Sequence, residues 1–86
     1  MISSEQIQII RVQEVLAITG IPKSSLYEKI KQGLFCPQIS LGARSVGFIL
    51  SEVKAVMALM INGADENELK MRIANLVMQR TDLLNN

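Results

Sequence analysis

Apolar residues recur at helical spacing soon after the start of the chain. Val12, Val15 and Leu16 share one face of a helix drawn over residues 11–19, with polar or small residues between them. Gly20 follows, and glycine readily adopts the left-handed conformation in which many helices end. The spacing therefore predicts a first helix over 11–19 that stops at Gly20.

A second helical period follows the sequence Gly-Ile-Pro. Pro22 suits a first helical turn, where the N–H that proline lacks has no helical partner in any case. Leu26 and Ile30, with Tyr27 beside them, form the inward face, and Gly33 ends the helix. Two short helices joined by a tight turn form the helix-turn-helix pattern, which occurs in DNA-binding proteins and also as an ordinary helical corner.

The apolar period changes from helical to strand-like after the second helix. The runs QISL and VGFIL are rich in β-branched and aromatic residues and flank the turn sequence GARS. They predict a hairpin with Gly42 in its turn and Arg44 at its tip, and Pro37 is tolerated at the strand edge before it. A hairpin that follows a helix-turn-helix is a wing.

The sequence EVKAVMALMIN predicts a third helix, with Ser51 as its N-cap and Gly63 at its end. Every residue from Ala55 to Ile61 is apolar. Because a helix on the outside of a monomer keeps a polar face, this run predicts a helix that is covered on nearly all sides.

A fourth helix is predicted over residues 66–84, with Asp65 as its N-cap and Glu68 completing a capping box. Two apolar stripes run along it. The first stripe comprises Leu69, Ile73, Leu76, Val77 and Leu84, and the second comprises Met71, Ala74 and Met78. The stripes predict two partners for this helix, its own domain and a second subunit; the alternative is one broad stripe that faces a monomer core.

Together these elements predict a mainly α-helical fold with a small β-hairpin wing and an additional C-terminal helix. Residues 1–62 form the predicted winged helix-turn-helix domain. Residues 1–10 are its arm, within which IQIIRV can begin a short strand. Residues 63–86 form the C-terminal helix, packed on the same domain.

Composition excludes several classes of chemistry. The chain has no histidine and one cysteine, Cys36, so one copy cannot build a zinc site or a histidine-based triad. We expect no catalytic residue, metal, cofactor or small-molecule substrate, and we expect Cys36 to be a small buried hydrophobe. A single cysteine favours a reducing compartment. With no signal peptide and no apolar run of roughly 18 residues, a cytoplasmic, nucleoid-associated protein without a membrane partner is expected.

Charge is distributed unevenly along the chain. Nine Lys and Arg against eight Asp and Glu leave a net charge of +1. Residues 1–50 carry +2 and residues 51–86 carry −1. This asymmetry permits a nucleic-acid-binding face on the first half of the chain without requiring one.

The stretch from Arg11 to Met57 holds three short motifs: R-V-x-E-V at the first helix, T-G-I-x-K-S-S-L-Y across the turn, and L-G-A-R-S-V-G-F through the wing into S-E-V. In these motifs it resembles the AlpA family of prophage regulators. These are winged helix-turn-helix proteins related to MerR-type DNA-binding domains and to excisionases. The resemblance implies a sequence-specific DNA-binding protein that regulates prophage transcription or has an excisionase-like architectural role.

The chain also departs from the family pattern. Lys23 stands where members often carry Arg, Glu28 where they carry a basic residue, and Phe48 where many have Trp. The usual domain also ends soon after S-E-V, whereas this chain adds a fourth helix. The weakened positive charge disfavours tight DNA binding by a single copy, and the added helix can restore affinity by pairing two domains.

The second helix of a helix-turn-helix lies in the major groove with its N-terminal residues nearest the bases. We therefore expect Lys23 and Ser24 to contact base edges. Ser25 and Tyr27 are better suited to phosphate oxygens, which position a protein without reading sequence. The helix N-terminus adds its dipole and free N–H groups toward a phosphate.

The remaining candidates lie further along this helix and on the wing. Glu28 accepts from cytosine N4 if it faces the groove, and otherwise only tunes the charge of the surface or pairs with Lys31. Lys31 is either a phosphate contact or a solvated helix end. Arg44, next to Ser45, is the expected probe of the minor groove or the backbone. The complete predicted set is Lys23, Ser24, Ser25, Tyr27, Glu28, Lys31, Arg44 and Ser45.

Two kinds of partner follow from this interpretation. The first is double-stranded DNA, bound by a homodimer or cooperative oligomer whose contacts lie near residues 53–61 and 66–84. The alternative is a protein-interaction module, in which the winged helix is a scaffold and the apolar third and fourth helices bind another protein. The low net charge is compatible with the alternative.

Overall fold

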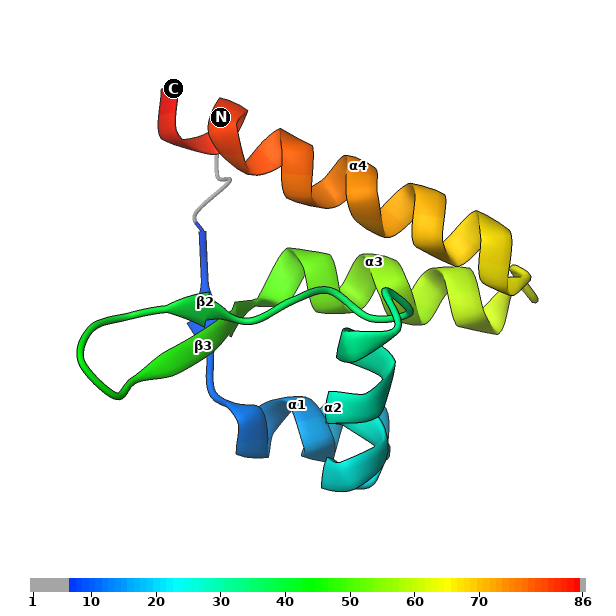
Figure 1. Ribbon diagram of the computed structural model, residues 1–86, viewed down its shortest axis with the longest axis horizontal. Coiled ribbons are helices and arrows are strands. Elements are labelled where there is room, and N and C mark those ends of the chain that lie inside the picture. The colour runs from blue at the N-terminus through cyan, green and yellow to red at the C-terminus, as the bar shows by residue number, and fades with distance from the viewer. Residues whose placement is uncertain (1–6, 86) are drawn as a thin grey trace.

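Residues 7–85, which the computed structural model describes, form four helices and three short strands (Figure 1). In chain order the elements are β1 (Ile9–Ile10), α1 (Val12–Thr19), α2 (Lys23–Lys31), β2 (Ile39–Ser40), β3 (Val46–Ile49), α3 (Leu50–Ile61) and α4 (Glu66–Asn85). The predicted class, mainly helical with a small hairpin wing and an additional C-terminal helix, is confirmed. Of the predicted arm, residues 1–6 lie outside the described residues.

The helix-turn-helix forms where the sequence predicts it. Gly20 has a φ of 75°, and its N–H donates to the Leu16 carbonyl at 2.8 Å, which closes α1. The Thr19 hydroxyl accepts from the N–H of Ile21 and so supports the turn. Pro22 precedes α2 as its extended N-cap, and α2 then runs from Lys23 to Lys31.

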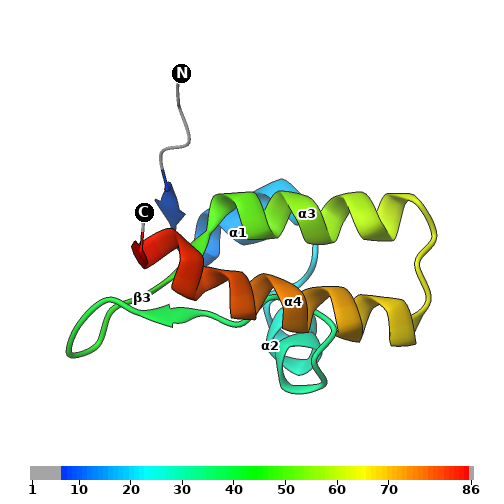
Figure 2. The ribbon, with the colours of Figure 1, turned by 90° about the horizontal axis from the view of Figure 1, so that it is seen from above.

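The wing belongs to a three-stranded antiparallel sheet with strand order β1-β3-β2. Ile39 of β2 lies opposite Gly47 of β3, which confirms the predicted hairpin. β1 occupies the other edge, with Ile10 opposite Phe48. The loop between β2 and β3 extends beyond the helices in both views (Figures 1 and 2).

Ser51 does not cap α3, contrary to the prediction. β3 continues directly into α3, which begins at Leu50, and Ile49 is the extended N-cap residue. The N–H of Leu50 donates to the Gln8 carbonyl at 2.9 Å. The backbone beside β1 thus satisfies one of the first-turn donors, while Ser51 lies exposed inside the helix and makes no cap.

The core lies between the helix-turn-helix, the sheet and α3. Phe35 and Phe48 are fully buried, and their rings meet edge to face with centroids 6.3 Å apart. Such a geometry stabilises by about 0.5–1.5 kcal/mol beyond the area that it buries. Leu26 anchors α2 in this core, and Cys36 is fully buried as expected.

α4 runs antiparallel to α3 and beside it, on the side of the molecule remote from the start of α2 (Figures 1 and 2). Asp65 caps it as predicted, since its Oδ1 accepts from the Glu68 N–H at 2.8 Å. Leu69 and Ile73 of the first predicted stripe are buried in the core. The Leu84 side chain lies outside the described residues.

The expectation that α3 is covered on nearly all sides is wrong within one chain. α4 covers one side of α3 and β3 packs against it near its start. A row of exposed side chains nevertheless runs along α3 at intervals of three or four residues through Lys54, Ala58 and Ile61, and Ile61 is 80% exposed. In the second stripe of α4, Met71 and Met78 are 60% and 72% exposed.

Candidate nucleic-acid interface

The start of α2 lies at the edge of the molecule furthest from α4 (Figure 1, bottom). Lys23 and Ser24 in its first turn are exposed, whereas Ser25 is half-buried because it points toward another side of the helix. In this described part of the chain no side chain caps the first turn of α2. The helix start is therefore open, and a cation and a hydroxyl lie beside it.

Lys23, Tyr27 and Lys31 follow one another at intervals of four residues and so line one face of α2. Lys23 and Lys31 are exposed, and Tyr27 is 36% exposed. Lys31 lies about 12 Å along the helix axis from Lys23, because each residue advances the helix by about 1.5 Å. The structure thus places Lys31 on the predicted face but at its far end.

Glu28 does not pair with Lys31, contrary to one of its three predicted roles. Its Oε2 accepts from Nε2 of Gln32, one turn further along, at 3.1 Å. Positions 31 and 32 both neighbour position 28 on the helix surface, and the carboxylate is taken up by Gln32. The carboxylate remains exposed beside the lysines and lowers the positive charge of this surface.

Arg44 lies exposed at the tip of the wing, as predicted. The base of its loop is closed by the N–H of Leu41, which donates to the Ser45 carbonyl at 2.8 Å. Ser45 is half-buried, so its backbone shapes the loop. The loop is therefore an ordered turn that projects from the sheet and carries one cation at its tip.

Two clefts on the described surface lie away from these residues. One, of about 320 Å³, lies between α3 and α4 and is lined by Ala58 and Leu76 among others. The other, of about 330 Å³, lies between α4 and the segment after α2, with Phe35 and Val77 in its lining. None of the predicted DNA-contacting residues lines either cleft.

The described residues carry neither a metal site nor a membrane span. Among residues 7–81, whose side chains the structure describes, no three Cys, Asp or Glu residues gather closely enough to hold a metal ion. No helix in the same part of the chain combines the length and the apolar character needed to cross a bilayer.

Comparison with known proteins places this winged helix in a family. The family model described as "Prophage CP4-57 regulatory protein (AlpA)" matches residues 8–59. The chain belongs to this family. The resemblance seen in the sequence is thereby confirmed, and this AlpA-family chain is related to a group of regulatory proteins. The matched segment contains α1, α2, the wing and most of α3, whereas α4 lies beyond it.

A relative of this AlpA-family chain comes from Enterobacteria phage P4, where it is named "Uncharacterized protein ORF88". The two are 45% identical over 58 residues, which is 67% of this chain and 66% of the relative. The match therefore spans about two thirds of each protein. No solved structure matches the chain significantly.

Arg11 is a surface cation of the AlpA-family segment that the sequence reasoning did not include in the site. It precedes α1, where its N–H donates to Oε1 of Glu14 at 2.9 Å. Its Nη1 donates to the carbonyl of Val46, the first residue of β3, at 3.3 Å. Arg11 thus adds an exposed charge beside the wing, next to the loop that carries Arg44. Its position in R-V-x-E-V is the sequence feature that could have indicated a role for Arg11. Its contact with a residue 35 positions away could not be predicted from the sequence.

Proposed function

We propose that this AlpA-family chain binds double-stranded DNA through α2 and the wing, and so regulates prophage transcription. The observation that carries the proposal is the pair of exposed cations, Lys23 at the open start of α2 and Arg44 at the wing tip, on a fold of a prophage regulatory family. Both lie on parts of the molecule that α4 leaves uncovered (Figure 1).

The first turn of α2 supplies the groups that contact base edges. Lys23 donates to guanine O6 and N7, and the hydroxyl of Ser24 bonds to several base edges. Tyr27 and the half-buried Ser25 contact phosphate oxygens, which set the orientation of the helix without reading sequence. The uncapped N–H groups and the helix dipole favour a phosphate at the same place.

The wing and the end of α2 extend this contact along the duplex. Arg44 enters the minor groove, where a narrow groove concentrates negative potential, and Ser45 follows it in the loop. Lys31 contacts a phosphate at the far end of α2. Glu28, held by Gln32, accepts from cytosine N4 if it faces a base and otherwise limits non-specific binding by its charge.

The test is selection of bound fragments from the source genome, followed by fluorescence anisotropy on the selected site. Arg44→Ala is expected to weaken binding to all sequences and to flatten the plot of log affinity against log salt by about 0.9. Lys23→Ala and Ser24→Ala are expected to change which site is preferred. Arg72→Ala, which removes an exposed arginine from α4, is the control and is expected to bind as the wild type does.

Unchanged affinity and specificity in all three variants would contradict the assignment of α2 and the wing. The location of selected fragments then refines the role. Sites at a promoter indicate transcriptional regulation, whereas phased repeats at an attachment site indicate an excision factor.

The exposed stripe of α4, defined by Met71, Ala74 and Met78, is proposed to pair two copies of the chain. One winged-helix module buries only about 600–1,000 Å² of protein surface on DNA, and a second module bound beside it raises the local concentration of each. An antiparallel pair of α4 helices crossing at Ala74 places Met71 of each copy near Met78 of the other, as an isologous contact requires. The small alanine at the centre allows close approach.

Light scattering during size-exclusion chromatography tests this pairing. Met71→Glu with Met78→Glu is expected to turn a dimer into a monomer, and Gln79→Glu, which adds charge at an exposed position on another face of the same helix, is the control. A monomeric wild type at high concentration contradicts the pairing. If such a monomer also fails to bind DNA but retains a phage or host protein through this stripe, the interaction-module alternative holds instead.

A further inference from the structure

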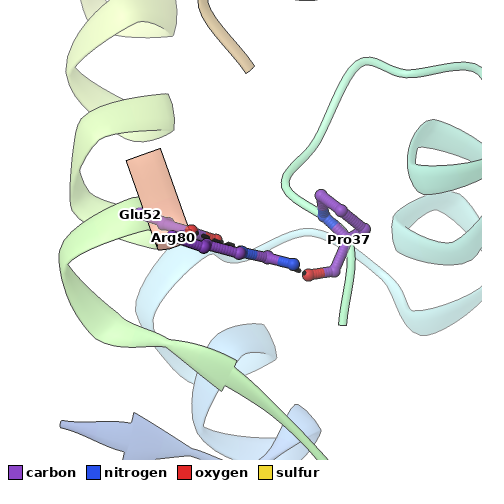
Figure 3. A network of polar contacts seen from close by, with 3 residues as sticks. All are labelled: Pro37, Glu52 and Arg80. Carbon is purple, nitrogen blue, oxygen red and sulfur yellow. Dashed lines mark hydrogen bonds and ion pairs between the residues drawn. The ribbon is translucent and has the colours of Figure 1, made fainter. Parts of the chain in front are cut away.

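One guanidinium joins the two ends of the wing. Arg80 lies on α4 and contacts Glu52, which follows the end of β3 by three residues. It also contacts Pro37, which precedes β2 by two residues. The three residues lie in one line in Figure 3, from α3 through the Arg80 guanidinium to the chain before β2. The C-terminal helix therefore bridges both segments from which the hairpin emerges.

The geometry of this bridge is that of a strong, charge-assisted contact. Nε and Nη2 of Arg80 donate to the two carboxylate oxygens of Glu52 at 2.8 and 2.7 Å. Nη2 also donates to the Pro37 carbonyl at 2.7 Å. Planar, bidentate contacts of this kind hold their partners in a defined orientation, which a lysine ammonium cannot reproduce.

Burial makes the contact obligatory for the folded chain. Glu52 is 3% exposed and is the one charged residue in the described part of the chain that is buried. A buried carboxylate requires a counter-charge and hydrogen-bond donors, and Arg80 supplies both. The hydrogen bonds that Arg80 donates to Glu52 raise the pKa of Arg80. An arginine side chain is charged at every accessible pH, so the counter-charge of Glu52 is permanent. The end of α4 is thus held against the base of the wing.

We propose that Arg80 is a positioning residue for the wing, so that the DNA contact of Arg44 depends on α4. The inference rests on the proposed function. It assigns a role in binding to a helix that lies beyond the segment matched by the family model. In this proposal the C-terminal helix α4 sets the orientation of the wing relative to the rest of the domain.

The experiment replaces the ion pair without leaving a buried charge. Glu52→Leu with Arg80→Met keeps similar volumes and removes the donor to Pro37, and such replacements commonly preserve folding. The matched control is Glu68→Leu with Arg72→Met, which removes the exposed pair of α4 joined at 3.8 Å. Both double variants leave the net charge unchanged, so any difference in DNA binding comes from position.

Two measurements are made on the folded variants. The first is hydrogen exchange of the Leu41 amide, which closes the wing loop and reports on it without DNA. The second is DNA affinity with and without Arg44→Ala. In the wild type and the control, Arg44→Ala is expected to weaken binding by about tenfold. In the Glu52→Leu/Arg80→Met variant, DNA affinity is expected to be about tenfold lower than in the wild type. Adding Arg44→Ala to this variant is then expected to lower the affinity by less than about threefold, because the effects of coupled residues are not additive.

The outcomes separate the two proposals. If the wild type binds no DNA, the proposed function fails, and unchanged exchange at Leu41 in the paired variant then overturns the positioning role as well. If the wild type binds and the paired variant binds equally well, with an unchanged effect of Arg44→Ala, the positioning role is overturned while the function stands. Faster exchange together with loss of the Arg44 effect supports it. Arg80→Lys in the otherwise native chain is expected to retain only part of the wild-type DNA affinity.

Discussion

Arg80→Met alone is expected to cost a large part of the stability of the fold. The substitution removes the cation from a carboxylate whose side chain is 4% exposed, and it removes the donor to the Pro37 carbonyl. Breaking a buried ion pair by deleting one partner costs about 3–5 kcal/mol, since the other charge is left without a partner. The two charge-assisted hydrogen bonds to Glu52 alone, at about 1.5–3 kcal/mol each, lead to a similar figure, and the bond to Pro37 is lost as well.

The size of this loss is decisive for a chain of 86 residues. Small domains are stable by about 5–15 kcal/mol, so the variant is expected to lose roughly a fifth or more of its free energy of unfolding. Urea denaturation followed by circular dichroism measures it at one fixed protein concentration, because any self-association adds to apparent stability. Glu52→Leu with Arg80→Met is expected to recover most of the loss, since no charge then remains buried.

The comparison with Arg72→Met decides whether burial is the reason. Arg72 and Glu68 form an exposed pair at 3.8 Å with side chains 57% and 44% exposed, and such pairs contribute about 0–1 kcal/mol. A cost for Arg80→Met no larger than that for Arg72→Met refutes the argument. A paired variant as unstable as the single one refutes it equally.

Three further predictions concern the wing, the buried cysteine and the cap of α4. Gly47→Ala is expected to cost about 1–3 kcal/mol in urea denaturation, because its Cβ would lie 2.6 Å from a methyl of Ile9 and 2.9 Å from one of Leu41; unaltered stability would disprove this packing. Burial, and then the charge of Glu52, raises the pKa of Cys36 from 9.0 to about 12. Below pH 9 the contribution of the protonated thiol to the free energy of unfolding is complete. As pH rises from 9 toward 12, the free energy of unfolding is expected to fall by up to about 1.4 kcal/mol per pH unit, and Cys36→Ala should abolish this fall. Asp65→Ala is expected to cost about 1 kcal/mol and Asp65→Asn much less, and equal costs would exclude the cap.

The ends of the helices show how much local sequence determines. Gly20, Gly33 and Gly63 each have a φ between 75° and 81° just beyond a helix, where the sequence predicts them. Asp65 caps α4 for the same local reason. These features depend on the conformational freedom of one residue or on a bond to a backbone group three residues away, so they can be read along the chain.

The start of α3 shows where that reading fails. Ser51 has the right side chain for a cap, but Gln8 supplies the acceptor for the Leu50 N–H from 42 residues away. A local rule cannot anticipate that an edge strand will lie there. The same limit applies to Arg11, whose contact with the Val46 carbonyl depends on how the sheet packs against α1.

For this protein the sequence alone determined the order of elements, the helix-turn-helix, the wing and the two stripes of α4, because periodicity and turn residues act over a few positions. The tertiary structure decided which stripe is buried, leaving Met71 and Met78 in solvent. It also brought Arg80 to Glu52 across 28 residues. The reason is that burial and ion pairing depend on which surfaces meet, and only the folded chain brings distant segments together.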